Sequence, residues 1–519
     1  MLLSEVVGTV DVVAGTRSRL AKTEALAGLL SRLAPDEIVP AVGFLTASPR
    51  QGRIGVGWRS LSALDTRHAD VPSLTVLDVD AALDELAAAG GAGSVAARRG
   101  ALEALASRAT TREWDFVARV ILGELRTGAL EGVLLDAIAQ ASGQGAAAVR
   151  RAAMLAGDLG ATARIALAEP AGALDAVGLE VGRPVLPMLA STAATVAAAI
   201  ATAGEAAGSS AREAGVSRSS VEYKLDGARI QVHRDGDSVR VYTRNLADIT
   251  ARVPEIVEIV RGLPAERLIL DGETLSLDED GGPRLFQDTM ARFGSETAPQ
   301  FVLRPWFFDV LHADGRDLID EPLCARQAVL EAVAGPWRVP GIVTADAGAA
   351  ERLSREALAA GHEGVVVKGI DSPYAAGRRG KSWIKVKPVL TYDLVVLAVE
   401  WGSGRRTGQL SNLHLGALDA AGEFGEPGGF VMVGKTFKGL TDELLRWQTD
   451  FFPTIQTHRS AYAVHVRPET VVEIAIDGVQ RSTRYPGGVA LRFARVKGYR
   501  PDKSPADADM IQTLRALLR

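Results

Sequence analysis

Lys224 lies in the segment of this chain that is best suited to chemistry, Glu222-Tyr-Lys-Leu-Asp-Gly-Ala-Arg229. A lysine is a nucleophile only when it has lost its proton, and the carboxylates of Glu222 and Asp226 on either side would raise its pKa. A cation is therefore needed near the amine, supplied either by a divalent metal or by arginines. Arg229 adds a guanidinium suited to phosphate. The segment predicts nucleophilic attack by Lys224 on a phosphate.

The same segment also has the pattern of two strands joined by a turn. Apolar and polar residues alternate from 221 to 223 and from 230 to 232, on either side of Asp226-Gly227. On this interpretation Lys224 is an exposed residue beside a hairpin, and nothing more. The glycine at 227 would serve either interpretation, because it can form a turn or let the backbone approach a ligand closely.

The spacing Lys-x-Asp-Gly-x-Arg from Lys224 to Arg229 resembles motif I of the covalent nucleotidyltransferases. That superfamily comprises the DNA ligases, the RNA ligases and the mRNA capping enzymes. The resemblance implies that Lys224 attacks the α-phosphate of a nucleoside triphosphate and carries the nucleotide as a phosphoramide. Glu222 and Arg229 are then expected among the nucleotide-binding residues.

Three segments downstream resemble further motifs of that superfamily. Thr243-Arg-Asn245 resembles motif Ia, which implies that its arginine, Arg244, contacts the sugar or a phosphate, although an exposed arginine at a strand end is the simpler interpretation. Asp271-Gly-Glu273, expected at the end of a strand, resembles motif III, where Glu273 meets the ribose or a metal. Phe307-Phe-Asp309 resembles motif IIIa, in which Phe308 stacks on the purine; core packing is the alternative.

Motifs IV and V have counterparts later in the chain. In Glu363-Gly-Val-Val-Val-Lys368 the resemblance makes Glu363 a metal carboxylate and directs Lys368 towards phosphate. The run from Arg379 to Lys387 resembles motif V. Because alternate residues of a strand face the same side, Lys385 and Lys387 should face the α-phosphate together, with Arg379 reaching it from the preceding loop.

Near the C-terminus, the run 492–503 resembles motif VI. Its Arg-x-Asp-Lys portion, which contains Arg500, Asp502 and Lys503, is implied to orient the pyrophosphate leaving group.

The elements that must position these residues fall into three predicted domains. Residues 1–180 read as an all-α domain, with apolar residues at helical spacing in 17–33, 79–89, 96–106 and 112–125. The run from Gly123 to Glu131 resembles the helical DNA-binding domain that precedes the catalytic core in many ATP-dependent DNA ligases. The alternative is a packed helix closed by a glycine cap at Gly128.

Strands and helices alternate in residues 181–388, which predicts an α/β or α+β nucleotidyltransferase (adenylation) domain. Residues 389–519 show short β runs separated by glycine turns and predict an all-β barrel, for which the family supplies the name OB-fold. Strands are expected at 394–400, 412–418, 430–433, 464–466, 471–475 and 491–496.

Composition restricts the remaining possibilities. The 519 residues, 47% hydrophobic and 23% charged, suit a multidomain globular protein, and the net charge of −5 does not by itself suggest nucleic-acid binding. A single cysteine, Cys324, excludes an intramolecular disulfide and a multi-cysteine zinc site. No signal-peptide pattern or membrane-length apolar run occurs, so we expect a cytoplasmic protein without a membrane partner.

Taken together, the resemblance of these segments to the family implies a multidomain ATP-dependent DNA ligase that uses Mg²⁺. The resemblance implies a nicked duplex as partner, bound without sequence specificity by a monomer. An RNA ligase or a capping enzyme is the alternative within the superfamily, because the choice of ATP over GTP is not readable from the residues. A non-catalytic nick-binding protein is the alternative outside the enzymes.

Overall fold

The computed structural model describes residues 1–52, 54–64, 66–91, 93–125, 131–206, 218–278, 282–284, 286–294, 302–436 and 438–518. The chain forms two compact units. One unit comprises Met1–Met188 with Asp314–Asp317 and Ala376–Arg378, and the other comprises Leu189–Ala313, Leu318–Ala375 and Arg379–Arg519. None of the described helices is long and apolar enough to cross a bilayer.

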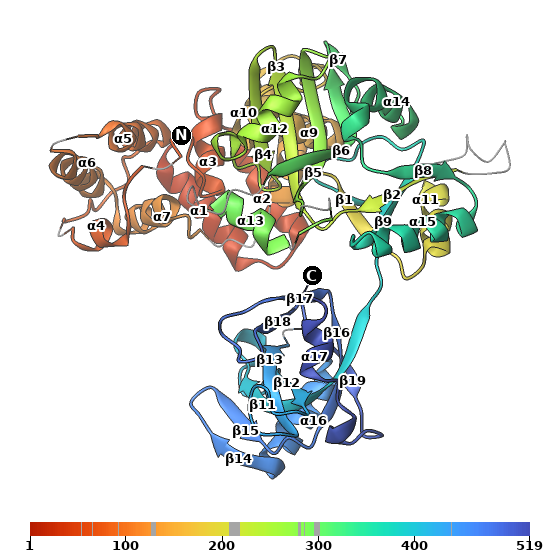
Figure 1. Ribbon diagram of the computed structural model, residues 1–519. Coiled ribbons are helices and arrows are strands. Elements are labelled where there is room, and N and C mark those ends of the chain that lie inside the picture. The colour runs from red at the N-terminus through yellow and green to blue at the C-terminus, as the bar shows by residue number, and fades with distance from the viewer. Residues whose placement is uncertain are drawn as a thin grey trace. The chain divides into compact units, whose positions relative to one another are not determined.

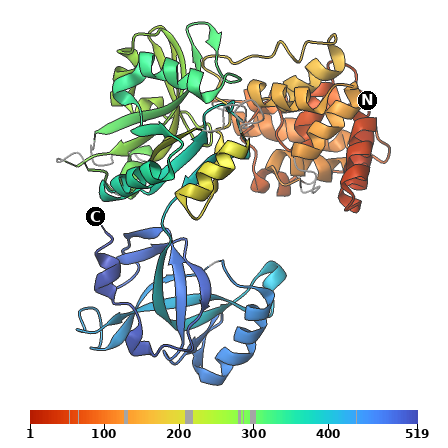
Figure 2. The ribbon, with the colours of Figure 1, turned by 90° about the vertical axis from the view of Figure 1, so that its right-hand side faces the viewer.

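The N-terminal unit is built from helices, as its periodicity predicts, and Figures 1 and 2 show them in red to orange. Leu83 and Phe44 are in one of its cores and Leu30 in the other, all fully buried. Its helices are α1 (Leu3–Gly15), α2 (Arg19–Leu30), α3 (Ile38–Leu45), α4 (Trp58–Ser62), α5 (Val76–Ala88), α6 (Ser94–Arg108), α7 (Thr111–Leu122), α8 (Glu131–Ser142), α9 (Ala146–Ala156) and α10 (Leu159–Ala168).

Helix α7 shows how local sequence sets these boundaries. Thr110 caps its N-terminus in a capping box with Glu113, and Gly123 ends it in the left-handed conformation. The glycine cap that we expected at Gly128 and most of the run 123–131 lie outside the described residues.

The second unit begins with an α/β region in which two sheets divide the strands. One sheet has the order β1-β10-β9-β2-β8, and the other contains β4-β3-β5-β6. The strands are β1 (Leu189–Thr192), β2 (Ser219–Lys224), β3 (Ala228–Asp235), β4 (Ser238–Thr243), β5 (Arg267–Ser276), β6 (Leu303–Ala313), β8 (Gly341–Thr344), β9 (Gly364–Gly369) and β10 (Arg379–Val386). The short strand β7 (Arg316–Asp317) belongs to the first unit.

Helices cover both sheets of this region. Helices α11 and α15 pack on the first sheet, and α12 and α14 pack on the second (Figure 1). The helices are α11 (Val196–Ala206), η2 (Thr250–Arg252), α12 (Pro254–Arg261), α13 (Phe286–Gly294), α14 (Leu323–Ala334), η3 (Gly335–Trp337) and α15 (Ala347–Ala359).

The hairpin interpretation of the Lys224 segment is wrong. Strand β2 pairs with β8 and β9, whereas β3 pairs with β4 and β5 in the other sheet. A side chain on Gly227 would collide with the carbonyl oxygen of Thr274. Glycine is therefore required here for the close approach to β5. Gly227 also lines the cavity described below, and its approach to a ligand stays a prediction. Lys224 ends the last strand before the chain crosses from one sheet to the other.

The C-terminal part of the second unit is β-rich. The long strand β11 pairs with β12, β15 and β16; β13, β14 and β19 extend that sheet, while β17 pairs with β18. Its elements are β11 (Leu390–Trp401), η4 (Gly404–Arg406), β12 (Leu410–Asp419), β13 (Gly429–Lys435), α16 (Asp442–Phe451), η5 (Phe452–Ile455), β14 (Gln456–Arg459), β15 (Ala463–Val466), β16 (Val471–Ile476), β17 (Gly478–Arg481), β18 (Val489–Arg492), β19 (Arg495–Tyr499), η6 (Pro505–Asp507) and α17 (Ile511–Arg515).

The expected strands of this region are present except near residue 493, but the region is not all-β as we had expected: helices α16 and α17 and strands β14 and β17 were not predicted. We expected one strand over 491–496, but β18 ends at Arg492 and β19 begins at Arg495. Phe493 between them has φ 55°, which lies in the left-handed region and outside the extended conformation of a regular strand.

Candidate active site

A cavity of 640 Å³ lies where the two sheets of the α/β region meet. Strand β2 contributes Lys224, and Arg229 and Phe308 come from β3 and β6 of the other sheet. Most of the predicted site residues line the cavity, namely Glu222, Lys224, Arg229, Arg244, Glu273, Phe308, Lys368, Arg379 and Lys385.

The register of the first sheet explains why residues far apart in sequence share this cavity. In the antiparallel pairs, Val366 of β9 lies opposite both Glu222 of β2 and Lys385 of β10. Two residues further along β9, Lys368 lies opposite Ser220 of β2 and Trp383 of β10. Directly opposed residues project from the same face, so this face presents acidic, basic and aromatic groups to one space.

The predicted nucleophile is held by a carboxylate. The Lys224 ammonium forms an ion pair with Glu363, and the Glu363 backbone N–H donates to the Lys224 carbonyl at 2.9 Å. Burial lowers the pKa of Lys224, but Glu363, Glu273 and Asp226 outweigh it and leave that pKa above its usual value. Of the two flanking carboxylates that we expected to raise this pKa, only Asp226 is among the causes. The amine still needs added positive charge before it can act as a nucleophile.

Two more lysines extend this charge cluster. Burial and repulsion from Lys224 and Lys387 lower the pKa of Lys385. Lys387 does not line the cavity; its ammonium lies 2.9 Å from Asp477 and 3.6 Å from Glu363. Glu363 thus contacts two lysine side chains from just outside the cavity wall, with its own pKa lowered because their attraction outweighs its burial.

Glu273 is an acidic residue of the cavity wall. Burial raises its pKa to about 7, despite attraction from Lys224 and Arg229. It lies inside β5, and not at a strand end as we had expected. Gly272 is needed there because a side chain on it would lie 2.6 Å from the Trp306 carbonyl oxygen.

Lys368 lines the same cavity, and its ammonium is paired with a carboxylate of the protein. Its ammonium, on a residue only 2% exposed, lies 2.5 Å from the Glu222 carboxylate and donates to the Phe308 carbonyl at 3.1 Å. The expectation that Lys368 is directed towards phosphate is not met, because the buried ammonium is satisfied by a carboxylate from the neighbouring strand.

Arg229 is likewise fixed by a protein carboxylate. Its guanidinium makes a two-point contact with fully buried Asp271, at 3.0 and 2.6 Å, and lies 5.3 Å from the Phe308 ring centroid. Asp271 also accepts a hydrogen bond from the Tyr374 hydroxyl at 2.5 Å. Arg229 therefore lines the cavity in a fixed position, beside the ring expected to stack on the purine.

The predicted basic residues differ in how they are placed. Arg244 and Arg379 are exposed at the cavity. Arg500 and Lys503 are not among the residues that line it; both pair with Asp393, and Arg500 also pairs with Asp502 at 2.7 Å. All the predicted basic residues thus line the cavity except Lys387, Arg500 and Lys503.

Sequence reasoning missed several residues of the site. Trp383 lines the cavity with its ring centroid 4.2 Å from the Lys368 ammonium, and its alternation with Lys385 along β10 could have indicated this. No local pattern marks Gln327, which binds Glu222. Arg492 begins the run that resembles motif VI, but nothing in the sequence indicates that it lies 3.3 Å from Asp226.

This arrangement can support the transfer of a phosphate-containing group to the Lys224 amine. An aromatic ring and a buried carboxylate line one part of the cavity, while the lysine nucleophile and further basic groups line another. Among the described residues no group of three or more His, Cys, Asp or Glu side chains could hold a metal by itself. A metal here would need oxygens from a substrate in addition to Glu273 and Glu363.

Comparisons with known proteins agree with this chemistry. Residues 187–387 match the family described as ATP dependent DNA ligase domain, residues 59–139 match DNA ligase N terminus, and residues 406–503 match ATP dependent DNA ligase C terminal region. The Probable DNA ligase of Pseudarthrobacter chlorophenolicus is 66% identical over 519 residues, 100% of both chains. That of Saccharopolyspora erythraea is 57% identical over 515 residues, 99% of this chain and 98% of the other.

A solved structure called Pmar-Lig_Pre has the same fold. It is 18% identical, with 96% of this chain and 99% of that chain covered and a TM-score of 0.59.

Proposed function

The chain belongs to the family of ATP-dependent DNA ligases, and from this premise we propose that it seals nicks in duplex DNA through a lysyl-AMP intermediate on Lys224. One observation supports the assignment of the nucleophile above all others. Lys224 lies in a cavity whose wall combines the Phe308 ring and the Glu222 carboxylate with Lys385 and the exposed arginines.

In the first step the Lys224 amine attacks the α-phosphorus of ATP. The Nζ–P bond forms, the bond from that phosphorus to the bridging oxygen breaks, and pyrophosphate leaves with the electron pair. The amine must lose a proton, which the pKa of Lys224 opposes as long as Glu363 holds the ammonium. Lys385, Arg379 and Arg244 are placed to neutralise phosphate charge.

Mg²⁺ fits the acidic groups of this site. Glu273 and Glu363 are the residues that would hold the ion. Its charge would stabilise the ionised form of Glu273 the most, because burial disfavours that form. The ion would supply positive charge that favours the neutral amine and screens the phosphates. Two carboxylates completed by phosphate oxygens and water are a usual set of ligands for Mg²⁺.

In the second step the DNA 5′-phosphate attacks the phosphorus of lysyl-AMP, and the N–P bond to Lys224 breaks. The 3′-hydroxyl then attacks the activated 5′-phosphate, a phosphodiester bond forms and AMP leaves. We assign these steps to a monomer that acts on nicked duplex without sequence preference. We divide the chain into three domains: residues 1–180 as the DNA-binding domain, 181–388 as the adenylation domain and 389–519 as the OB-fold domain.

Arg500 and Lys503 are assigned to the pyrophosphate in the first step. Both carry positive charge and are now held by Asp393. Exchange of that carboxylate for phosphate oxygens would keep their charges compensated.

The experiment is incubation of the purified chain with α-labelled ATP and Mg²⁺, followed by a denaturing gel and a chase with nicked duplex. Wild type should carry covalent label that moves to DNA and yields sealed strands. Lys224→Ala should lose the label by at least about three orders of magnitude. Lys381→Ala is a matched control on a lysine outside the cavity and should behave as wild type.

Label that persists on the Lys224→Ala protein would exclude Lys224 as the nucleophile. Label from GTP in place of ATP would redirect the function to RNA ends, as in RNA ligases and capping enzymes. Nick binding without any covalent label would indicate a binding protein.

A further inference from the structure

We propose that Gln327, together with Lys368 and Ser220, is a positioning residue that makes this site select a 6-aminopurine triphosphate, by fixing the carboxylate of Glu222 as a hydrogen-bond acceptor. The inference rests on the proposed function, because it concerns the nucleotide that Lys224 attacks. It adds residues that lie behind the cavity wall to those that line it.

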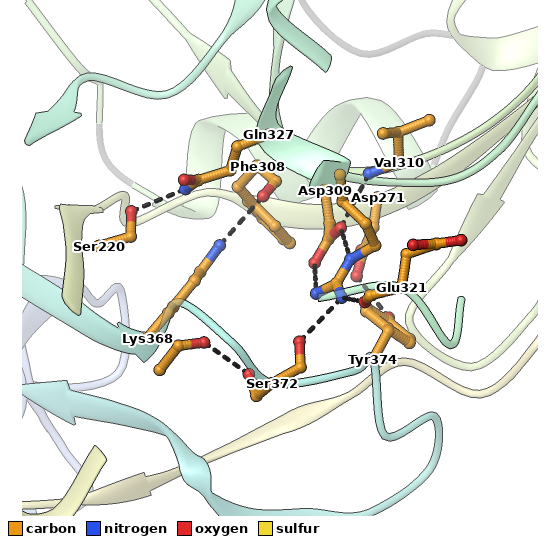
Figure 3. A network of polar contacts seen from close by, with 12 residues as sticks. Ser220, Asp271, Phe308, Asp309, Val310, Glu321, Gln327, Lys368, Ser372 and Tyr374 are labelled. Carbon is orange, nitrogen blue, oxygen red and sulfur yellow. Dashed lines mark hydrogen bonds and ion pairs between the residues drawn. The ribbon is translucent and has the colours of Figure 1, made fainter. Parts of the chain in front are cut away.

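Three donors converge on one buried carboxylate. The Glu222 Oε1 atom accepts from Ser220 Oγ at 3.0 Å and from Gln327 Nε2 at 2.8 Å. Its Oε2 atom lies 2.5 Å from the Lys368 ammonium. Gln327 also donates to Ser220 Oγ at 2.7 Å (Figure 3). All four residues are buried, between 0% and 6% exposed, so each of these bonds forms away from water.

Held in this way, the Glu222 carboxylate can act towards a ligand only as a hydrogen-bond acceptor. A carboxylate has about four acceptor positions and no proton to donate. The three protein donors use most of them, and Glu222 still lines the cavity. The ligand atom that meets it must therefore be a donor, such as the 6-amino group of adenine, whereas a 6-oxo group would place oxygen against oxygen.

Lys368 connects this carboxylate to the aromatic part of the wall. Its ammonium donates to the Phe308 carbonyl at 3.1 Å and lies 4.7 Å from that residue's ring centroid (Figure 3). The Trp383 ring centroid is 4.2 Å from the same ammonium on the adjacent strand. The base-stacking ring and the acceptor are therefore held at a fixed separation by one cation.

Gln327 is held in place by the residue before it. Arg326 is fully buried, makes a two-point contact with Asp309 at 2.7 and 3.0 Å, and donates to the Ser372 carbonyl at 3.0 Å. Helix α14 is thus anchored beside Phe308, and Gln327 reaches Glu222 from a fixed backbone. A rigid support of this kind is what precise hydrogen-bond selection requires.

The test compares ATP with inosine triphosphate, which has a 6-oxo group but lacks the 2-amino group of guanine. Rates of covalent nucleotide transfer to Lys224 give kcat/KM for each. Gln327→Met keeps the size of the side chain and removes both donors. We expect the preference for ATP over inosine triphosphate to fall about ten- to a hundredfold, mainly through a higher KM for ATP.

Gln231→Met is the matched control, because Gln231 is also a buried glutamine of this region and does not line the cavity. It should keep the wild-type preference. Ser220→Ala removes a single donor and should shift the preference in the same direction by a smaller factor, which keeps the proposal testable if Gln327→Met does not fold.

The possible outcomes separate the two proposals. If wild type takes label from neither nucleotide, the proposed function fails. If wild type takes label and both variants keep its preference, or lose transfer from both nucleotides equally, the positioning role is overturned and the proposed function stands. A reduced preference in both variants, with the control unchanged, supports the role.

Discussion

The Lys224 ammonium donates a hydrogen bond to the Glu363 carboxylate, although 139 residues separate the two along the chain. They meet because β2 and β9 are antiparallel neighbours, with Lys224 opposite Gly364. The proposed nucleophile is thereby held as a cation, and its reactivity depends on what else Glu363 binds.

Glu363→Gln should lower the pKa of Lys224, because it removes the carboxylate that contributes most to raising it. The metal-free variant should therefore hold more neutral amine at pH 8 than wild type does. Acylation of Lys224 by a neutral ester, measured by peptide mass spectrometry, reports this directly. Lys381 in the same digest should be unaffected; an unchanged rate at Lys224 would refute the role of Glu363.

Glu273→Gln should stabilise the metal-free protein at pH 8 and leave it unchanged at pH 4.5. Burial raises the pKa of Glu273 from 4.5 to about 7, so the folded state retains a proton that the unfolded state loses between those values. The protonated Glu273 side chain therefore adds to the free energy of unfolding at low pH. That contribution, about 2–3 kcal/mol, is lost as pH rises through 7. Urea unfolding at both pH values measures it.

Addition of Mg²⁺ provides a second comparison. If Glu273 is a ligand, the ion should stabilise wild type at pH 8 and have less effect on Glu273→Gln. Equal stabilisation of the two proteins would place the ion elsewhere.

Arg326→Met should destabilise the α/β region by about 3–5 kcal/mol, because it leaves the fully buried carboxylate of Asp309 without its partner. The double variant Arg326→Met, Asp309→Leu removes both charges and should recover most of that loss. Denaturant unfolding of the two single variants and the double variant gives the coupling energy. Additive losses would show that the pair is not coupled.

Gly227→Ala should destabilise the same region by about 1–3 kcal/mol or more, since the added methyl group would overlap the Thr274 carbonyl oxygen. Gly498→Ala is the matched control, because a side chain there meets no atom within 4 Å. Thermal unfolding compares them. Equal melting temperatures for the two variants would mean that β3 and β5 can separate without cost.

Local sequence by itself determined the elements and the identity of the reactive groups. Helical spacing and caps set boundaries such as those of α7, and alternation along β10 placed Lys385 on one face with its apolar neighbours behind. The direction of the pKa shift at Lys224 was predicted, but of the two neighbouring carboxylates only Asp226 contributes to it, after the distant Glu363 and Glu273. The boundaries and the alternation depend on contacts within a few residues, which the sequence contains directly.

Only the tertiary structure decided which groups pair across the site. In it, β2 and β3 belong to different sheets, Lys368 forms an ion pair with Glu222, and Arg229 forms one with Asp271. It also brought Gln327 behind the cavity. Each of these contacts joins strands or helices distant in sequence, and a buried charge takes the partner that the packing offers. Local spacing does not specify that partner, so the sequence predicted the reactive residues but not the network that holds them.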